Sequence, residues 1–265
     1  MKTRMSSEFI FQLFALLIAV IVVHALYVGA IRPMADAQLQ QEMELQAAGE
    51  DYVPERSFAV VIRDFEQEAC FILLIWALAI MGYKGLRTIE EKAILERALL
   101  DIPDGTSLLP EDAREYSRSL EALPATEQDL LLPRTLLSAL QRFATTGSIQ
   151  AVSDTIKEQC EVESDRLDSE MSMVRYIAWA IPSIGFIGTV RGIGDALGQA
   201  YKAVEGDISG VTVSLGVAFN STFVALVLSI IIMFCLHQLQ LSQERLVLDC
   251  QRYADKRLMR HLVAH

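Results

Sequence analysis

The sequence predicts an all-α polytopic membrane protein with four transmembrane helices and a helical cytoplasmic domain between the second and the third. Four long apolar runs and the absence of any strand-like alternation predict this fold class. The composition agrees, since 52% of the 265 residues are hydrophobic, 22% are charged, and the mean hydropathy is +0.32. Such a mixture is typical of a membrane protein with a water-exposed part.

The first two predicted spans are residues 9–31 and residues 69–84. A helix needs about 20 apolar residues to cross the hydrocarbon, and the first run meets that length. The second run is shorter, but Lys84 can extend its head group toward the lipid head groups. Lys2 and Arg4 would also suit a signal peptide before the first run. Its apolar core exceeds a signal peptide's, and no Ala-x-Ala site follows, so we interpret it as a retained helix.

The third and fourth predicted spans are residues 176–200 and residues 208–236. The third includes the sequence Ile-Pro-Ser-Ile-Gly-Phe-Ile-Gly-Thr-Val-Arg-Gly at residues 181–192. Glycine and proline weaken a helix, and an arginine at membrane depth costs about 2.5–3.5 kcal/mol even on the lenient insertion scales. A simple lipid anchor needs none of these residues, so this stretch indicates a functional segment.

Lysine and arginine near the helix ends predict the orientation. They gather in residues 1–8, 85–175 and 237–265, which are therefore predicted to be the cytoplasmic N-terminus, the helical domain and a C-terminal helix. Residues 32–68 are predicted to form an acidic periplasmic loop and residues 201–207 a short one. The sequence thus predicts a multi-pass protein of the bacterial inner membrane with both termini in the cytoplasm.

Several function classes are disfavoured. The net charge of −11 and the pI near 4.9 offer no basic surface for nucleic acid. The four cysteines have no metal-ligand spacing, so neither a metal site nor a disulfide framework is predicted. No side chains form the constellation of an enzyme, and we expect no cofactor.

Small and weakly polar residues recur at helical spacing on the last two spans. The two stripes consist of Pro182, Gly185, Thr189, Gly192 and Ala196 on the third span, and of Ser214, Ala218, Thr222, Ala225 and Ser229 on the fourth. Such residues, with the Gly188-x-x-x-Gly192 pair, let helices pack closely. Alternatively, the stripes form a narrow hydroxyl-lined surface that holds another helix and a few waters.

Proton transfer across a bilayer usually needs an ionisable group at depth. Within the predicted spans Asp195 is the only carboxylate, and it lies near the outer end. Hydroxyl groups relay protons but do not store them. If this chain conducts protons, we expect a partner to supply the carboxylate.

Residues 182–192 and 216–229 resemble the core of the MotA/TolQ/ExbB proton channel family. That family carries a Pro-x-x-Gly-x-x-Gly-Thr-Val motif on its third helix and an Ala-x-x-x-Thr segment on its fourth, and the likeness extends over about residues 175–240. Val217 differs, since TolQ and ExbB have a glutamate there. The long segment at residues 32–68 differs from the tight connection of MotA.

This resemblance implies the proton-conducting subunit of an ion-driven membrane motor, a stator-type protein that converts proton motive force into movement. It implies a homo-oligomer, a pentamer in this family, around a single-span MotB/TolR/ExbD-like partner whose membrane aspartate carries the proton. Thr189 and Thr222 would flank that aspartate, and Pro182 would mark the inner end of the channel helix. The packing or hinge residues of the two helices would be Pro182, Gly185, Gly188, Gly192, Ala218 and Ala225.

Four alternatives remain open at the level of the sequence. Arg191 is either a functional charge or the partner of Asp195 in an ion pair near the outer head groups. Ser221 is either a second pathway hydroxyl, as in sodium-driven relatives, or an ordinary serine bonded to its own helix. Protons are the expected ion and sodium the less favoured one. A non-conducting membrane scaffold would also account for the glycines.

Overall fold

A computed structural model of the chain describes residues 2–47, 57–103 and 105–263. Within these residues the chain is helical, with no β-strand beyond a single bridge between Leu108 and Leu262. The helices in chain order are α1 (Lys2–Leu26), a π-helical turn (Tyr27–Ile31), α2 (Arg32–Ala47), α3 (Phe58–Val61), α4 (Phe65–Leu95), α5 (Ala113–Glu121), α6 (Ala125–Gln128), α7 (Leu131–Thr146), α8 (Ile149–Glu170), α9 (Ser172–Gly198), α10 (Ala200–Val204), α11 (Ser209–Arg257) and a 3₁₀ turn (Met259–His261).

Four helical segments are long and apolar enough to cross a membrane, namely Glu8–Glu42, Phe65–Leu95, Ile149–Gly198 and Ser209–His261. The predicted all-α fold with four candidate spans is therefore confirmed. The chain divides into two compact units. Unit 1 comprises residues 1–82 and 173–236, and unit 2 comprises residues 83–172 and 237–265. The cytoplasmic location of residues 85–175 stays a prediction.

The segment predicted as a loop at residues 32–68 is largely helical where it is described. α2 continues directly from the π-helical turn, and residues 48–56 lie outside the described residues. α4 begins at residue 65 rather than 69, so Glu66, Gln67 and Glu68 belong to this helix. Carboxylates near a helix N-terminus interact favourably with the helix dipole, which explains why acidic residues extend the helix there. α10 likewise occupies most of the short loop predicted at residues 201–207.

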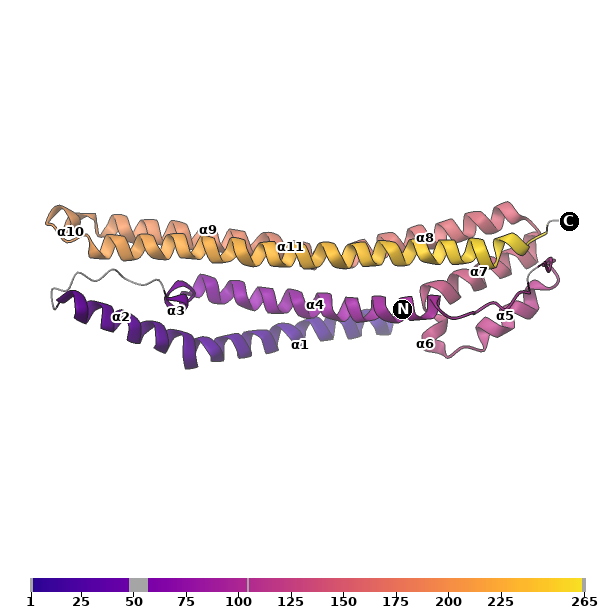
Figure 1. Ribbon diagram of the computed structural model, residues 1–265, viewed down its shortest axis with the longest axis horizontal. Helices are drawn as coiled ribbons and strands as arrows, with labels where there is room; N and C mark the ends of the chain where they lie inside the picture. Colours follow the sequence, from indigo (N-terminus) through magenta and orange to yellow (C-terminus); the bar gives the residue numbers. More distant parts are fainter. Residues whose placement is uncertain (1, 48–56, 104, 264–265) are drawn as a thin grey trace. The chain divides into compact units, whose positions relative to one another are not determined.

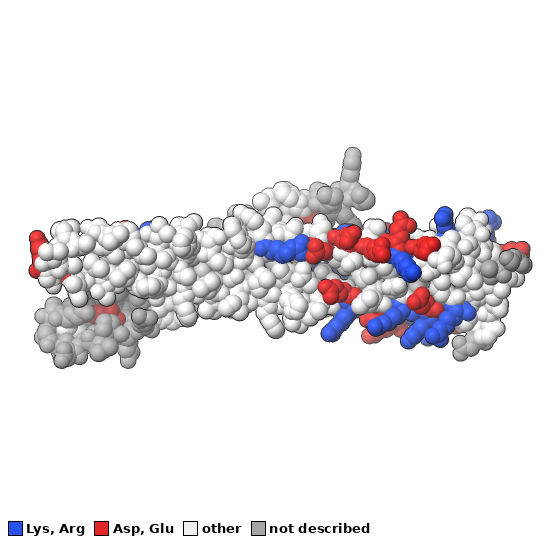
Figure 2. Space-filling model, turned by 90° about the horizontal axis from the view of Figure 1, so that it is seen from above, with Lys and Arg blue, Asp and Glu red and all other residues white. Residues whose placement is uncertain are grey.

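Unit 1 consists of antiparallel helix pairs (Figure 1). α1 lies along α4, where the indole Nε1 of Trp76 donates to the carbonyl of Gln12 at 2.9 Å. α9 lies along α11, with small residues at their contact. The face of unit 1 in Figure 2 shows almost no charged side chains, whereas charges gather over unit 2. An uncharged surface is what a membrane-spanning unit requires.

Unit 2 has an apolar core between α7 and α8, which also receives side chains from α5 and the end of α11. α7 ends at Gly147, whose φ of 60° is a left-handed conformation that favours glycine. The next residue, Ser148, caps α8 by accepting a hydrogen bond from the backbone N–H of Ala151. This tight turn brings the two helices together. Their contact is filled by buried side chains, including Leu136, Leu140, Phe143, Val152 and Ile156.

Glu163 is buried in unit 2 and joins two arginines. Its Oε2 lies 2.8 Å from the Nη2 of Arg134, and its Oε1 lies 2.8 Å from the Nη2 of Arg166. We expect Glu163→Gln to lower the free energy of unfolding by about 2 kcal/mol, because both charge-assisted hydrogen bonds are weakened. Thermal unfolding in detergent measures this change. Asp249→Asn, which disrupts the exposed pair with Arg252, is the control and should have little effect. Equal losses from both variants would contradict the prediction.

Candidate functional site

The contact between α9 and α11 depends on three glycines of α9. A Cβ added at Gly192 would lie 2.8 Å from both the Cβ and the N of Ala218, and one added at Gly188 would lie 2.5 Å from the Cβ of Ser221. One added at Gly185 would overlap the Cβ of Ala225. Only glycine allows the two backbones to approach this closely.

The two small-residue stripes predicted from the sequence therefore cover one another. Gly185, Gly188, Gly192, Ala218 and Ala225 are all buried in this seam. Of the two readings that the sequence left open, the described chain shows close helix packing, because the lack of side chains lets α9 and α11 approach each other. A hydroxyl-lined surface that also holds another helix stays a prediction.

Thr189 and Thr222 meet at the centre of the seam. Their hydroxyl groups form a short hydrogen bond with each other. Thr189 Oγ1 also lies 3.0 Å from the carbonyl oxygen of Ala218, and Thr222 Oγ1 lies 3.1 Å from that of Gly185. Each hydroxyl has one hydrogen to donate, so the pair can exchange donors and acceptors between these two carbonyl oxygens. Both threonines are half-buried, which leaves part of each side chain accessible.

Pro182 lies inside α9 and not at an end of the helix. Proline has no N–H, so it frees the carbonyl of the residue four positions earlier, which is Ala178. The hydroxyl of Ser229 on α11 donates to this carbonyl at 3.0 Å. Ser229 thus satisfies the backbone group that the proline leaves unpaired, as a buried backbone requires.

Ser221 bonds neither to its own helix nor to the threonine pair in this structure. It is buried and accepts a hydrogen bond from the Nε2 of Gln67 on α4, at 3.3 Å. The same Nε2 lies 3.2 Å from the carbonyl oxygen of Val61. Gln67 was not predicted as a site residue, because hydropathy places the start of the second span after it.

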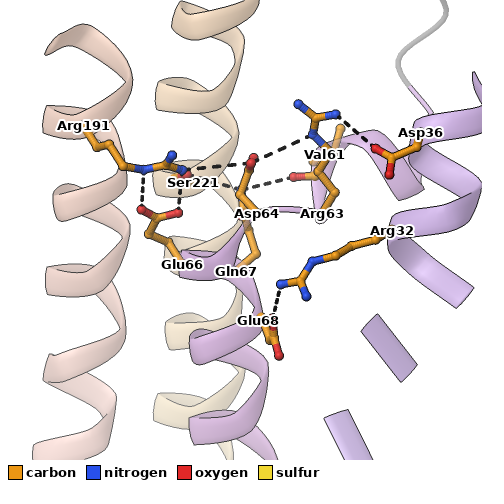
Figure 3. Close-up of polar contacts among 10 residues, drawn as sticks. All are labelled: Arg32, Asp36, Val61, Arg63, Asp64, Glu66, Gln67, Glu68, Arg191 and Ser221. Carbon is orange, nitrogen blue, oxygen red and sulfur yellow. Dashed lines mark hydrogen bonds and ion pairs between the residues drawn. The ribbon is translucent and has the colours of Figure 1, made fainter. Parts of the chain in front are cut away.

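Arg191 forms its ion pair with Glu66 of α4 and not with Asp195. The Nε and Nη2 atoms of Arg191 lie 2.7 Å and 2.9 Å from the two carboxylate oxygens of Glu66, and Nη2 is 4.0 Å from Asp64 (Figure 3). The predicted pair with Asp195 is therefore wrong in this structure. A partner four residues along the same helix is the local candidate, but a bidentate geometry from another helix is stronger.

A second carboxylate of α4, Glu68, is buried beside two groups of the first helical segment. It forms a short ion pair with Arg32, and its Oε1 lies 2.7 Å from the Nδ1 of His24. The guanidinium of Arg32 also lies 4.5 Å from the ring centre of Phe65. The polar start of α4 is the sequence signal that could have indicated Glu68 as the partner of His24.

These features define a multi-pass helical membrane protein with polar groups held inside its helix contacts. Residues 127–252 match the family model described as the MotA/TolQ/ExbB proton channel family. The resemblance predicted from the sequence is confirmed over this stretch of the chain. The matched stretch contains all of α9 and most of α11, including Thr189 and Thr222. Comparisons with curated proteins and with solved structures found no match.

Proposed function

We propose that this chain is the proton-conducting subunit of an ion-driven membrane motor. In the proposed assembly, five copies surround the transmembrane helices of a single-span MotB/TolR/ExbD-like partner in the bacterial inner membrane. The partner's membrane aspartate takes up and releases protons beside Thr189 and Thr222, and its helices move relative to the ring. One charge crossing 100 mV releases about 2.3 kcal/mol, several times the thermal energy.

The observation that carries this proposal is the Thr189–Thr222 hydroxyl pair at the centre of a glycine-lined seam. Two hydroxyls that can exchange donor and acceptor roles suit a proton relay. The carboxylates Glu66 and Glu68 of unit 1 are already held by cationic partners. This supports an external carboxylate as the proton carrier.

The surfaces of α9 and α11 support an oligomer. Large apolar side chains that are more than half exposed point away from the seam, including Trp179, Phe186, Ile187, Phe219, Phe223 and Ile230. Contiguous apolar surface in a membrane-spanning unit is covered either by lipid or by another protein helix. A ring of copies would place neighbours on part of this surface and lipid on the rest.

We expect Thr189→Val and Thr222→Val each to lower the proton flux about tenfold, because each removes a relay hydrogen bond that contributes about 1–1.5 kcal/mol. The flux is measured in vesicles that contain the chain and its partner. Valine has the shape of threonine, so the helix packing is retained. Thr212→Val is the matched control, because Thr212 is exposed on the same helix and bonds only to the carbonyl of Ile208.

Two further outcomes separate the alternatives. If ion flux is driven by a sodium gradient and not by a proton gradient, sodium is the transported ion. Full proton flux in both variants would remove the threonines from the pathway. No flux from the wild-type complex under either gradient would favour the non-conducting scaffold.

A further inference from the structure

The side chain of Gln67 is almost completely buried, with 1% of its surface exposed. Its Nε2 donates toward Val61 and Ser221, but its Oε1 is buried and accepts no hydrogen bond from the described residues. Buried carbonyl groups are nearly always hydrogen-bonded, so an orphaned one calls for a ligand or a water molecule. Ser221 accepts from Gln67, which leaves its own hydroxyl hydrogen to donate to a third group.

Gln67 lies between a charged cluster and the threonine pair. On one side, the Cγ of Glu66 and the hydroxyl of Ser221 both face Gly188, where an added Cβ would lie 3.2 Å and 2.6 Å from them. On the other side, Ser221 and Gly188 directly precede Thr222 and Thr189 in the sequence. Figure 3 shows the contacts of Glu66 with Arg191 and of Gln67 with Ser221. The contact of Gln67 with α11 thus lies one residue along that helix from Thr222.

The charged cluster has four carboxylates, three guanidinium groups and one imidazole. The carboxylates are Asp36, Asp64, Glu66 and Glu68, the guanidinium groups are those of Arg32, Arg63 and Arg191, and the imidazole is that of His24. With a neutral imidazole the cluster has a surplus negative charge, which raises the local concentration of cations. Asp64 has the weakest partners, at 3.9 Å from Arg63 and 4.0 Å from Arg191. Burial raises the pKa of Asp64, although both arginines act in the opposite direction, and this favours proton uptake there.

We propose, resting on the proton-conducting function above, that Gln67 is a positioning residue of a proton inlet. The Oε1 of Gln67 and the hydroxyl of Ser221 hold a water molecule that connects the charged cluster at the start of α4 to the Thr189–Thr222 pair. The proton moves by rearrangement of hydrogen bonds from one water to the next. The amide of Gln67 neither gains nor loses a proton.

The test compares two variants of Gln67 in vesicles that contain the chain and its partner. Gln67→Met keeps the length of the side chain and removes both polar atoms, and we expect the proton flux to fall about tenfold. Gln67→Glu, whose neutral carboxyl offers one donor and one acceptor, should keep the flux within about twofold of the wild type. Thr212→Val is the control, because Thr212 is exposed on α11 and bonds only to the carbonyl of Ile208, so this variant should also keep the flux. Size-exclusion chromatography checks that each variant assembles.

Two results would overturn the inlet while leaving the proposed function intact. In the first, Gln67→Met conducts as well as the wild type while the threonine variants are impaired. In the second, both Gln67 variants assemble and lose flux equally, which would assign Gln67 a packing role. Absence of flux from the wild-type complex would instead overturn the proposed function and the inlet together. Loss of flux in Gln67→Met but not in Gln67→Glu, with Thr212→Val unaffected, would support the inlet.

Discussion

Gly185→Ala is expected to lower the free energy of unfolding by about 3 kcal/mol, the upper part of the range for overpacked cores. The added methyl group would overlap the Cβ of Ala225, and it would lie 3.1 Å from the carbonyl oxygen of Ser221 and 3.3 Å from the Cα of Thr222. Backbone atoms cannot move away by a side-chain rotation, so α9 and α11 must separate locally to accommodate the methyl group. That separation would also stretch the hydrogen bond from Thr222 to the carbonyl of Gly185. Thermal unfolding in detergent measures the loss.

Gly194→Ala on the same helix is the matched control. An added Cβ there has no atom within 4 Å, so alanine should raise helix stability by up to about 1 kcal/mol. The double variant Gly185→Ala/Ala225→Gly should recover part of the lost stability, because it removes the methyl group that is overlapped. If Gly185→Ala were as stable as Gly194→Ala, the close contact between α9 and α11 would not exist in the protein.

The sequence sufficed for those parts of the fold that depend on local patterns. Long apolar runs predicted the four candidate spans, and the spacing of small residues predicted which faces of the last two helices carry small side chains. Which faces meet depends on contacts between helices, which periodicity does not report. Thus the stripes were identified correctly as sets of residues, whereas their closure on each other became evident only in the structure.

The polar start of α4 shows why the rest of the site was missed. Hydropathy ends an apolar run at charged residues, so Glu66, Gln67 and Glu68 were assigned to a loop. In the structure, Arg191 compensates Glu66 and Arg32 compensates Glu68. The residues Glu66 and Arg191 are 125 positions apart in the chain. No local rule for ion pairs, such as the i to i+4 spacing that indicated Asp195, can predict such a partner.

Arg191→Leu is expected to lower the free energy of unfolding by about 2 kcal/mol, since it removes two charge-assisted hydrogen bonds and leaves the Glu66 carboxylate without its main partner. The Glu66 side chain is 12% exposed, so water compensates little of the loss, whereas the 43% exposure of Arg191 keeps the effect below that of a fully buried pair. Thermal unfolding in detergent again measures the change. Asp195→Asn should have almost no effect, because Asp195 does not pair with Arg191.

The double variant Glu66→Leu/Arg191→Leu distinguishes this pair from a general need for charge. Replacing both partners leaves no buried carboxylate unpaired, so the double variant should be more stable than Arg191→Leu alone. A larger loss of unfolding free energy from Asp195→Asn than from Glu66→Leu would support the Arg191–Asp195 pair inferred from sequence spacing. It would contradict the Arg191–Glu66 contact between α4 and α9.

Proton flux in the same variants shows whether the pair has a role in conduction besides its role in stability. If the double variant is stable and conducts like the wild type, the role of the Arg191–Glu66 pair is limited to packing α4 against α9. A stable double variant with reduced flux would show that these charges also act on the proton path.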